Sequence, residues 1–224
     1  MSKNETYEEF VNKFKPKKTT DDCYTPPKIY SVILDWVKKY YGVNERIIRP
    51  FNPNDDYKKY DYSNAVVVDN PPFSILAEII DYYLENNIKF FLFAPALTCF
   101  VYLAKNRKIC ILPIDVNITY ENGAKVCTGF ITNLENNAIN INAELYKLIK
   151  NCHEDKSRKK VNHSCDYMCI GNCNKLAKRG VDLKIKSFKE FVRKKDNYKI
   201  FGGGVLLHEC DREKFKKILE DLND

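Results

Sequence analysis

The chain has 224 residues, of which 44% are hydrophobic, and this is enough apolar material for the core of one ordinary domain, which excludes global disorder. No apolar run has the length of a membrane span, and the amino terminus is charged and does not resemble a signal peptide. The nine cysteines are therefore expected to be reduced thiols and not a disulfide framework. We therefore expect a cytoplasmic protein without a membrane partner, and its net charge of +7 allows a polyanionic one.

Apolar spacing in the first part of the chain predicts alternating helices and strands. Residues 1–22, rich in Lys, Thr and Asp, are expected to form a loose arm before one domain over residues 23–224. Helical spacing predicts a helix at 29–41, and a short strand is predicted at 47–51. Residues 65–69 form a continuous apolar run, typical of a strand buried on both faces.

The pattern continues along the chain and then changes its period. Ser74 is predicted to cap a helix over 74–86, and strands are predicted at 88–95 and 108–112. In residues 116–134, apolar and polar residues alternate on both sides of an Asn-Gly pair, which indicates a β-hairpin. This order predicts an α/β fold with a mostly parallel sheet and an antiparallel hairpin, and such sheets bind ligands beyond the carboxyl ends of their strands.

The segment that follows the apolar strand is Asp69-Asn70-Pro71-Pro72-Phe73. It resembles the catalytic motif Asp/Asn/Ser-Pro-Pro-Tyr/Phe of amino-methyltransferases, and a strand before it and a helix after it are the context that the motif needs. The alternative is a strand that simply ends at two prolines, with Phe73 packed inside.

The resemblance implies a role for each residue of this motif. The Asn70 side-chain carbonyl and the Pro71 backbone carbonyl would each accept a hydrogen of a target amine, drawing its nitrogen towards tetrahedral geometry for attack on a sulfonium methyl. Pro71 and Pro72 would fix the backbone, and Phe73 would stack on a base flipped out of a DNA duplex.

Two further segments resemble the parts of DNA adenine-N6 methyltransferases that hold S-adenosyl-L-methionine. Tyr24-Thr25-Pro26 is similar to the Tyr/Phe-Thr-Pro segment that lies against the methionine part of the cofactor, and it also fits the start of a helix. Pro50-Phe51 matches the cofactor loop Asp-Pro-Phe-x-Gly-x-Gly.

This cofactor loop departs from the family pattern. Arg49 replaces the acidic residue, and Pro and Asp replace the two glycines, which let a loop approach a ligand closely. We assign Asp69 and Asp56 to the cofactor. Asp55 or Asp61 are alternatives to Asp56 for the ribose hydroxyls or the amino group, and each of these three carboxylates also fits a solvated loop.

Over residues 24–134 the chain resembles the small phage-encoded DNA adenine-N6 methyltransferases, which implies a Rossmann-like sheet, double-stranded DNA as partner and the cytoplasm of a bacterium or phage-infected host. Too few residues separate the cofactor loop from the catalytic strand for the usual elements between them. Either the sheet is reduced, or residues 198–211 supply a strand or, with Gly202-Gly203-Gly204, a permuted cofactor loop.

Residues 150–180 are rich in Cys and Lys. Cys165, Cys169 and Cys173 would line one face of a helix, but they lack a Cys-x-x-Cys knuckle, so we expect packed thiols and no metal. The basic run 156–160 fits a solvated face or phosphate contacts.

Three functions remain open from the sequence. The first is methyl transfer to the exocyclic amine of adenine in DNA. The second is a degenerate methyltransferase-like DNA-binding or counter-defence protein, and the third is methyl transfer to RNA or to a protein amide. We expect a monomer or a weak dimer.

Overall fold

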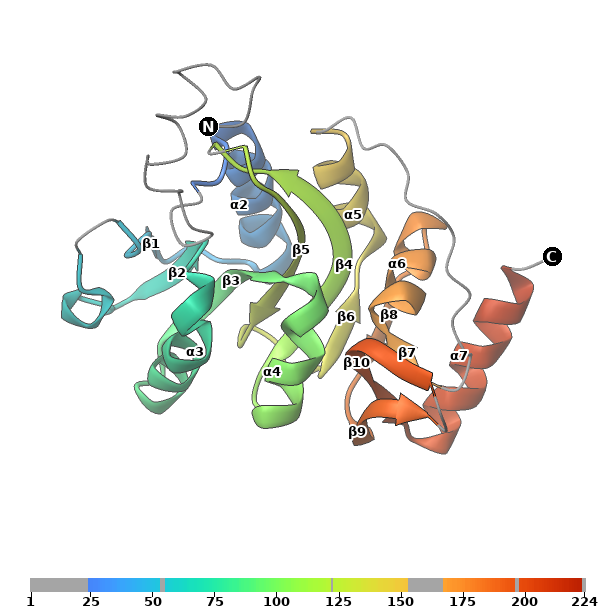
Figure 1. Cartoon of the computed structure of the whole chain (residues 1–224). Helices are drawn as coiled ribbons and strands as arrows, with labels where there is room; N and C mark the ends of the chain where they lie inside the picture. Colours follow the sequence, from blue (N-terminus) through green and yellow to red (C-terminus); the bar gives the residue numbers. More distant parts are fainter. Residues whose placement is uncertain (1–23, 53–54, 122, 153–166, 196–197, 223–224) are drawn as a thin grey trace, which may run out of the picture.

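A computed structural model describes residues 24–52, 55–121, 123–152, 167–195 and 198–222. Within these ranges the chain forms two β-sheets with helices packed around them (Figure 1). The larger sheet has seven strands in the order β1-β2-β3-β5-β4-β6-β8, and the smaller has three in the order β7-β10-β9. The arm predicted for the start of the chain and the basic run lie outside the described residues.

Five strands of the larger sheet run in one direction. β1, β2 and β3 are parallel, β5 is antiparallel to its neighbours β3 and β4, β6 is parallel to β4, and β8 is antiparallel to β6. The predicted α/β fold with a mostly parallel sheet and an antiparallel hairpin is therefore confirmed. The strands are β1 (Arg46–Ile48), β2 (Ala65–Asp69), β3 (Lys89–Pro95), β4 (Cys110–Thr119), β5 (Lys125–Thr132), β6 (Ile139–Ile141) and β8 (Leu183–Ile185).

Helices α2 and α3 cover opposite faces of this sheet, because neighbouring side chains of a strand point to opposite faces. The ring of Trp36 in α2 lies 6.1 Å from that of Phe91, whereas the ring of Tyr83 in α3 lies 5.7 Å from that of Phe90. The helices are α2 (Pro27–Tyr41), α3 (Leu76–Glu85), α4 (Cys99–Lys105), α5 (Ala143–Lys150), α6 (Ile170–Lys178) and α7 (Glu209–Asp221), with 3-10 turns η2 (Tyr57–Lys59), η3 (Phe73–Ile75) and η4 (Ala96–Thr98). Among the described helices, none has the length and hydropathy needed to cross a bilayer.

Buried strands form the centre of the core. All five residues of β2 are buried, as the continuous apolar run predicts for a strand covered on both faces. β3 is buried from Phe90 to Ala94, and its neighbour β5 from Thr128 onward. This rigid centre fixes the carboxyl ends of β2 and β3, which is where the candidate motif begins.

The predicted start of α3 is wrong. Ser74 lies inside η3, and α3 begins after this turn without a side-chain cap. Pro72 precedes the turn with φ −57° and ψ 119°, a backbone shape outside the helix. The chain therefore makes a tight 3-10 turn before the α-helix, because the proline pair holds it extended past the strand.

The strand predicted at 108–112 and the first arm of the hairpin are one strand, β4. The register to β5 shifts between Leu112 and Val116, where Asp115 adopts a positive φ of 44°. Such a bulge bends a strand without ending it, so two apolar runs join into one bent strand. The hairpin itself is confirmed, with Gly123 at φ +80° in its turn.

The larger sheet ends at β1, which pairs directly with β2. Among the described residues no strand lies beyond β1, where the family resemblance leads us to expect more. The later strands β6 and β8 extend the opposite side of the sheet.

The three consecutive glycines lie in the smaller sheet, formed by β7 (Met168–Cys169), β9 (Phe188–Lys195) and β10 (Tyr198–Leu207), so they do not complete the larger one. A Cβ on Gly202 would lie 2.5 Å from the Leu97 carbonyl oxygen, and one on Gly203 would lie 2.5 Å from the Phe191 ring. Both glycines have positive φ, +73° and +77°. Close packing within the protein therefore accounts for these two glycines without a ligand.

Candidate functional site

The candidate motif lies where the carboxyl ends of β1 and β2 and the end of β4 meet. Asn70 follows β2 directly, and its side-chain oxygen accepts a hydrogen bond from the Tyr120 hydroxyl at 3.5 Å. On the other side, the Phe51 backbone amide donates to the Asp69 carboxylate at 3.4 Å. The loop after β1, the motif after β2 and the hairpin end thus converge on one edge of the sheet, as the parallel order requires.

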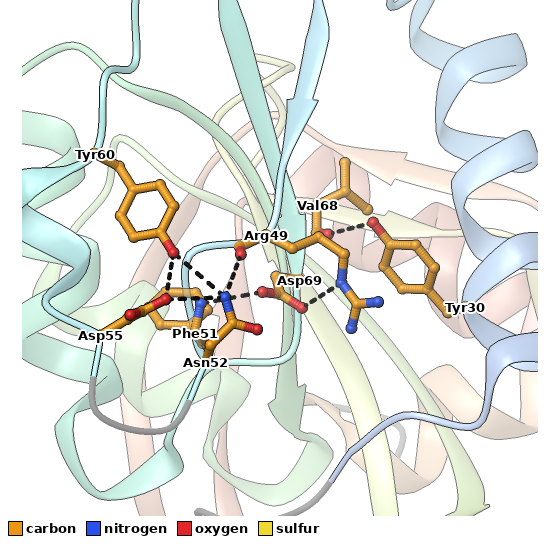
Figure 2. A network of polar contacts seen from close by, with 8 residues as sticks. All are labelled: Tyr30, Arg49, Phe51, Asn52, Asp55, Tyr60, Val68 and Asp69. Carbon is orange, nitrogen blue, oxygen red and sulfur yellow. Dashed lines mark hydrogen bonds and ion pairs between the residues drawn. The ribbon is translucent and has the colours of Figure 1, made fainter.

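Asp69 is held in an ion pair with Arg49, the residue that replaces the family's acidic one. Arg49 Nε donates to the Asp69 carboxylate at 3.0 Å, and the guanidinium carbon lies 3.9 Å from the centre of the Tyr30 ring. The Tyr30 hydroxyl in turn donates to the Val68 carbonyl at 2.9 Å. Figure 2 shows the guanidinium lying between the carboxylate and the ring, so α2, β1 and β2 are joined at this point.

Burial sets the ionisation of this cluster. Desolvation raises the pKa of the Asp69 carboxyl above its ordinary value, and the Arg49 guanidinium opposes that shift. Burial likewise raises the pKa of Tyr30 to about 12, so its hydroxyl stays protonated and keeps donating at neutral pH.

Arg49→Met is expected to lower the free energy of unfolding at pH 7 by about 2 kcal/mol, less than for a fully buried pair, because half of the Arg49 side chain is exposed. In the folded protein the pKa of Asp69 is raised above its unfolded value of 3.8. The contribution of Asp69 to the free energy of unfolding therefore falls as the pH rises from 3.8 through the pKa of the folded state. Removing Arg49 raises that pKa further. The difference in the free energy of unfolding between the wild type and Arg49→Met should therefore become smaller as the pH falls towards 4.

Urea unfolding of the wild type and the variant at pH 7 and pH 4 checks this expectation. Arg46→Met is the matched control, because Arg46 pairs with Asp61 on the surface, where both side chains are exposed. The control should change stability little at either pH. A deficit for Arg49→Met that grows on acidification would show that Asp69 is not the group being stabilised.

The four residues of the motif have different environments. Pro71 is buried, whereas Asn70, Pro72 and Phe73 are half-buried. Phe73 packs against the core with part of its ring and keeps the rest accessible. Its environment therefore fits both a packing role and contact with a base, and the accessible part of Asn70 is what a target amine needs.

Side chains of the loop after β1 are bonded to one another. Asn52 Nδ2 donates to Asp55 at 3.1 Å, and the Tyr60 hydroxyl donates to the same carboxylate at 2.6 Å, as Figure 2 shows. Asp56 accepts from the Lys58 amide at 3.0 Å and so caps η2. These bonds give the loop carboxylates a structural role, and the prediction that Asp56 contacts a cofactor stays a prediction.

Pro50 is buried, and the aromatic ring of Phe51 faces the protein. Its centroid lies 5.9 Å from that of Tyr57 and 6.5 Å from that of Tyr83. The half-buried ring therefore has an apolar back and an accessible remainder. This is the environment expected of a hydrophobic wall for a ligand, as the resemblance implies.

The Tyr24-Thr25-Pro26 segment lies beside the same edge. The Tyr24 carbonyl accepts from the Glu121 amide at 3.1 Å, next to the tyrosine that contacts the motif. This segment precedes a helix, as predicted, but Pro26 and not Thr25 is the N-cap residue of α2, and no side chain caps the helix. Thr25 is buried, and its hydroxyl has no hydrogen-bond partner within the described part of the chain.

Three large hydrophobic side chains in the described residues are exposed. Among the described residues, the large hydrophobic residues classed as exposed are Tyr24, Ile75 and Leu97, at 42%, 37% and 39%. Ile75 comes directly after the motif, and Leu97 lies just after the end of β3.

Two other features lie away from the motif. A hollow of about 440 Å³ opens at the amino-terminal edge of the strands and is lined by residues such as Asn64, Asn86 and Lys89. The prediction that the cysteines line one face of a helix is wrong for Cys169 and Cys173, because Cys169 lies in β7 and Cys173 in α6. Cys165 lies outside the described residues. In the described ranges, no group of three or more His, Cys, Asp or Glu residues could hold a metal ion.

Comparisons of this chain with protein-family models, with curated proteins and with solved structures gave no match.

Sequence reasoning missed three residues of the site. Tyr120 contacts Asn70, and its hydroxyl lies 3.2 Å from that of Thr128, which is buried in β5. Tyr30 supports Arg49 from α2. The hairpin pattern indicates that Tyr120 ends a strand, but only the strand order brings that end beside β2.

Proposed function

We propose that this chain transfers a methyl group from S-adenosyl-L-methionine to the exocyclic amine of adenine in double-stranded DNA. The observation that supports it most is the position of Asn70. It directly follows a buried parallel strand and is half-buried, its side chain contacts the Tyr120 hydroxyl, and the preceding residue, Asp69, accepts from the Phe51 amide. No charged base is needed there, because the adenine amine needs acceptors and alignment.

The chain's own residues supply those acceptors. Asn70 has a side-chain carbonyl and Pro71 a backbone carbonyl, adjacent in sequence and fixed by the proline pair. The Tyr120 hydroxyl donates to Asn70 Oδ1, which orients the amide with its oxygen towards the hairpin end. The cofactor, when bound, supplies the methyl group as a sulfonium.

Residues beside the motif fit the cofactor in part. The half-buried Phe51 ring offers an apolar contact at the edge where the resemblance expects the ligand, and Thr25 is buried. The loop after β1 fits less well, because Asn52 and Asp55 occupy it with side chains bonded to each other. We therefore expect weaker cofactor binding than in relatives with a glycine loop.

One observation favours a second candidate, a degenerate methyltransferase-like DNA-binding protein. Arg49 forms an ion pair with Asp69 at the position where the family has an acidic residue. Calorimetry with S-adenosyl-L-methionine separates the two: measurable binding supports the enzyme, and no binding supports the degenerate protein. Methyl transfer measured in parallel on DNA, RNA and protein then identifies the substrate class.

Duplex DNA affinity is expected to fall about 100-fold between 50 and 200 mM salt, as for a protein that contacts about four phosphates. The net charge of +7 supplies the cations for such contacts, and each contact releases counterions from DNA. Fluorescence anisotropy with a labelled unmethylated duplex at several salt concentrations measures the slope. A flat response, or no binding in dilute buffer, would favour a protein substrate.

A further inference from the structure

Four exposed basic side chains gather where the turn after α4 meets β9. We call this set the basic strip, and its members are Arg107, Lys186, Lys189 and Arg193. The Arg107 guanidinium donates to the Phe188 carbonyl at 3.1 Å and lies 4.3 Å from the centre of the Phe188 ring. This contact fixes the start of β9 to the residues that follow α4.

β9 leads from this contact towards the edge of the larger sheet that carries the motif. Whereas the start of β9 lies at the end of α4, the middle of β10 lies at η4, which precedes α4, because a Cβ on Gly202 would meet the Leu97 carbonyl oxygen. Val192 pairs with Gly204 in β10, and both strands contact α4 (Figure 1). η4 directly follows the carboxyl end of β3, the neighbour of β2. The Arg193 end of the basic strip therefore lies towards the candidate site.

The cations of the basic strip have no acidic partners within the described ranges. None of the four forms an ion pair there, whereas Lys39 and Lys89, elsewhere on the surface, each pair with a glutamate. Residues 186–193 include one acidic residue, Glu190. Positive charges that the protein does not neutralise attract a polyanion.

The aromatic ring beside these cations favours a duplex over a single strand. Proteins that bind single-stranded nucleic acids stack the bases on accessible aromatic rings. Phe191 is half-buried, its ring packs against Gly203, and the Arg193 guanidinium lies 5.6 Å from its centre. Because this ring is engaged within the protein, the described side chains here offer charges for phosphate groups and not a platform for bases.

We propose that the basic strip binds the phosphate backbone of duplex DNA beside the candidate site. The identity of the partner rests on the proposed function. The location of this surface does not follow from the family resemblance, which ends at residue 134, before β9. Lys189 and Arg193 lie four residues apart in a strand, about 13 Å, so they contact different phosphates. Such contacts position a duplex without reading its bases.

Fluorescence anisotropy with a labelled duplex tests this surface through the double variant Lys189→Gln/Arg193→Gln. The wild type should lose about 100-fold in affinity between 50 and 200 mM salt, and the variant only about 10-fold, as for two fewer phosphate contacts. Lys39→Gln/Lys89→Gln is the matched control, because it removes the same charge from two lysines that pair with glutamates. Its salt dependence should equal that of the wild type. Lys189→Arg/Arg193→Lys keeps both charges and should also bind like the wild type.

Three results would overturn the inference. A Lys189→Gln/Arg193→Gln variant with the salt dependence of the wild type, or a control that changes as much, would exclude the basic strip as the DNA surface and leave the proposed function standing. Single-stranded RNA of the same length that binds as tightly as the duplex through the same two residues would exclude duplex DNA as the specific partner. If the wild type binds no duplex in dilute buffer, both this inference and the proposed function fail.

Discussion

Asn70→Ala is expected to abolish methyl transfer to DNA while it leaves the fold and cofactor binding nearly unchanged. The side chain is half-buried at the end of β2, and the alanine removes the oxygen that would accept a hydrogen of the adenine amine. Losing one such preorganised group raises a barrier by about 3 kcal/mol or more, a rate loss of about 100-fold or more. The loss should appear in kcat, because the contact matters most as the amine changes geometry.

Single-turnover methyl transfer, with calorimetry for the cofactor and thermal unfolding for the fold, measures the three properties separately. Asn70→Asp keeps an acceptor oxygen next to the Tyr120 hydroxyl and should retain part of the activity. Asn106→Ala is the control: this residue is also half-buried but lies between α4 and β4, where its side chain accepts from the Lys108 amide. Turnover like the wild type in Asn70→Ala would remove the proposed mechanism.

Gly202→Ala is expected to lower the free energy of unfolding by about 3 kcal/mol, the sum of overpacking and of a left-handed backbone for a residue with a side chain. The added Cβ would lie 2.5 Å from the Leu97 carbonyl oxygen, and a backbone atom cannot rotate away. Cofactor affinity should stay unchanged below the unfolding temperature, because this glycine packs the smaller sheet against η4.

Gly123→Ala is the matched control for Gly202→Ala. Gly123 has a similar φ of +80°, but no atom lies within 4 Å of the added Cβ. It should therefore cost only the backbone strain, about 1 kcal/mol. Urea unfolding of both variants gives the comparison. A small effect at Gly202 combined with lost cofactor binding would instead support a permuted cofactor loop around the three glycines.

Local patterns predict the elements that surround the site. The 3.6-residue spacing predicts α2, and the continuous apolar run predicts β2 to the residue, because both signals come from burial of neighbouring side chains. The alternating run around the Asn-Gly pair predicts the hairpin of β4 and β5. These elements fix Asn70 at the end of a buried strand before any tertiary contact is known.

What the sequence does not predict depends on contacts between distant segments. The bend in β4 at Asp115 and the separate sheet containing β10 arise from packing against other elements, which no local period encodes. The contact between Tyr120 and Asn70 joins residues 50 positions apart. That contact depends on the order of the strands in the sheet, which the spacing of hydrophobic residues does not predict.

The loop after β1 is an intermediate case. The sequence marks Arg49 as a departure from the family pattern, but it does not indicate which residues the Arg49 guanidinium contacts. The structure pairs Arg49 with Asp69 and stacks it on Tyr30. A residue that first looks like a loss of the cofactor site thus becomes part of a different polar cluster at the same edge.

Methyl transfer to adenine in DNA can be followed in the DNA itself. The full chain is incubated with unmethylated duplex DNA and S-adenosyl-L-methionine carrying a deuterated methyl group, and the DNA is then digested and its nucleosides are analysed by mass spectrometry. We predict N6-methyldeoxyadenosine that carries the deuterated methyl and that forms about 100-fold or more slowly with Asn70→Ala. Digests with no labelled nucleoside, or with the label on a different base, would contradict the account.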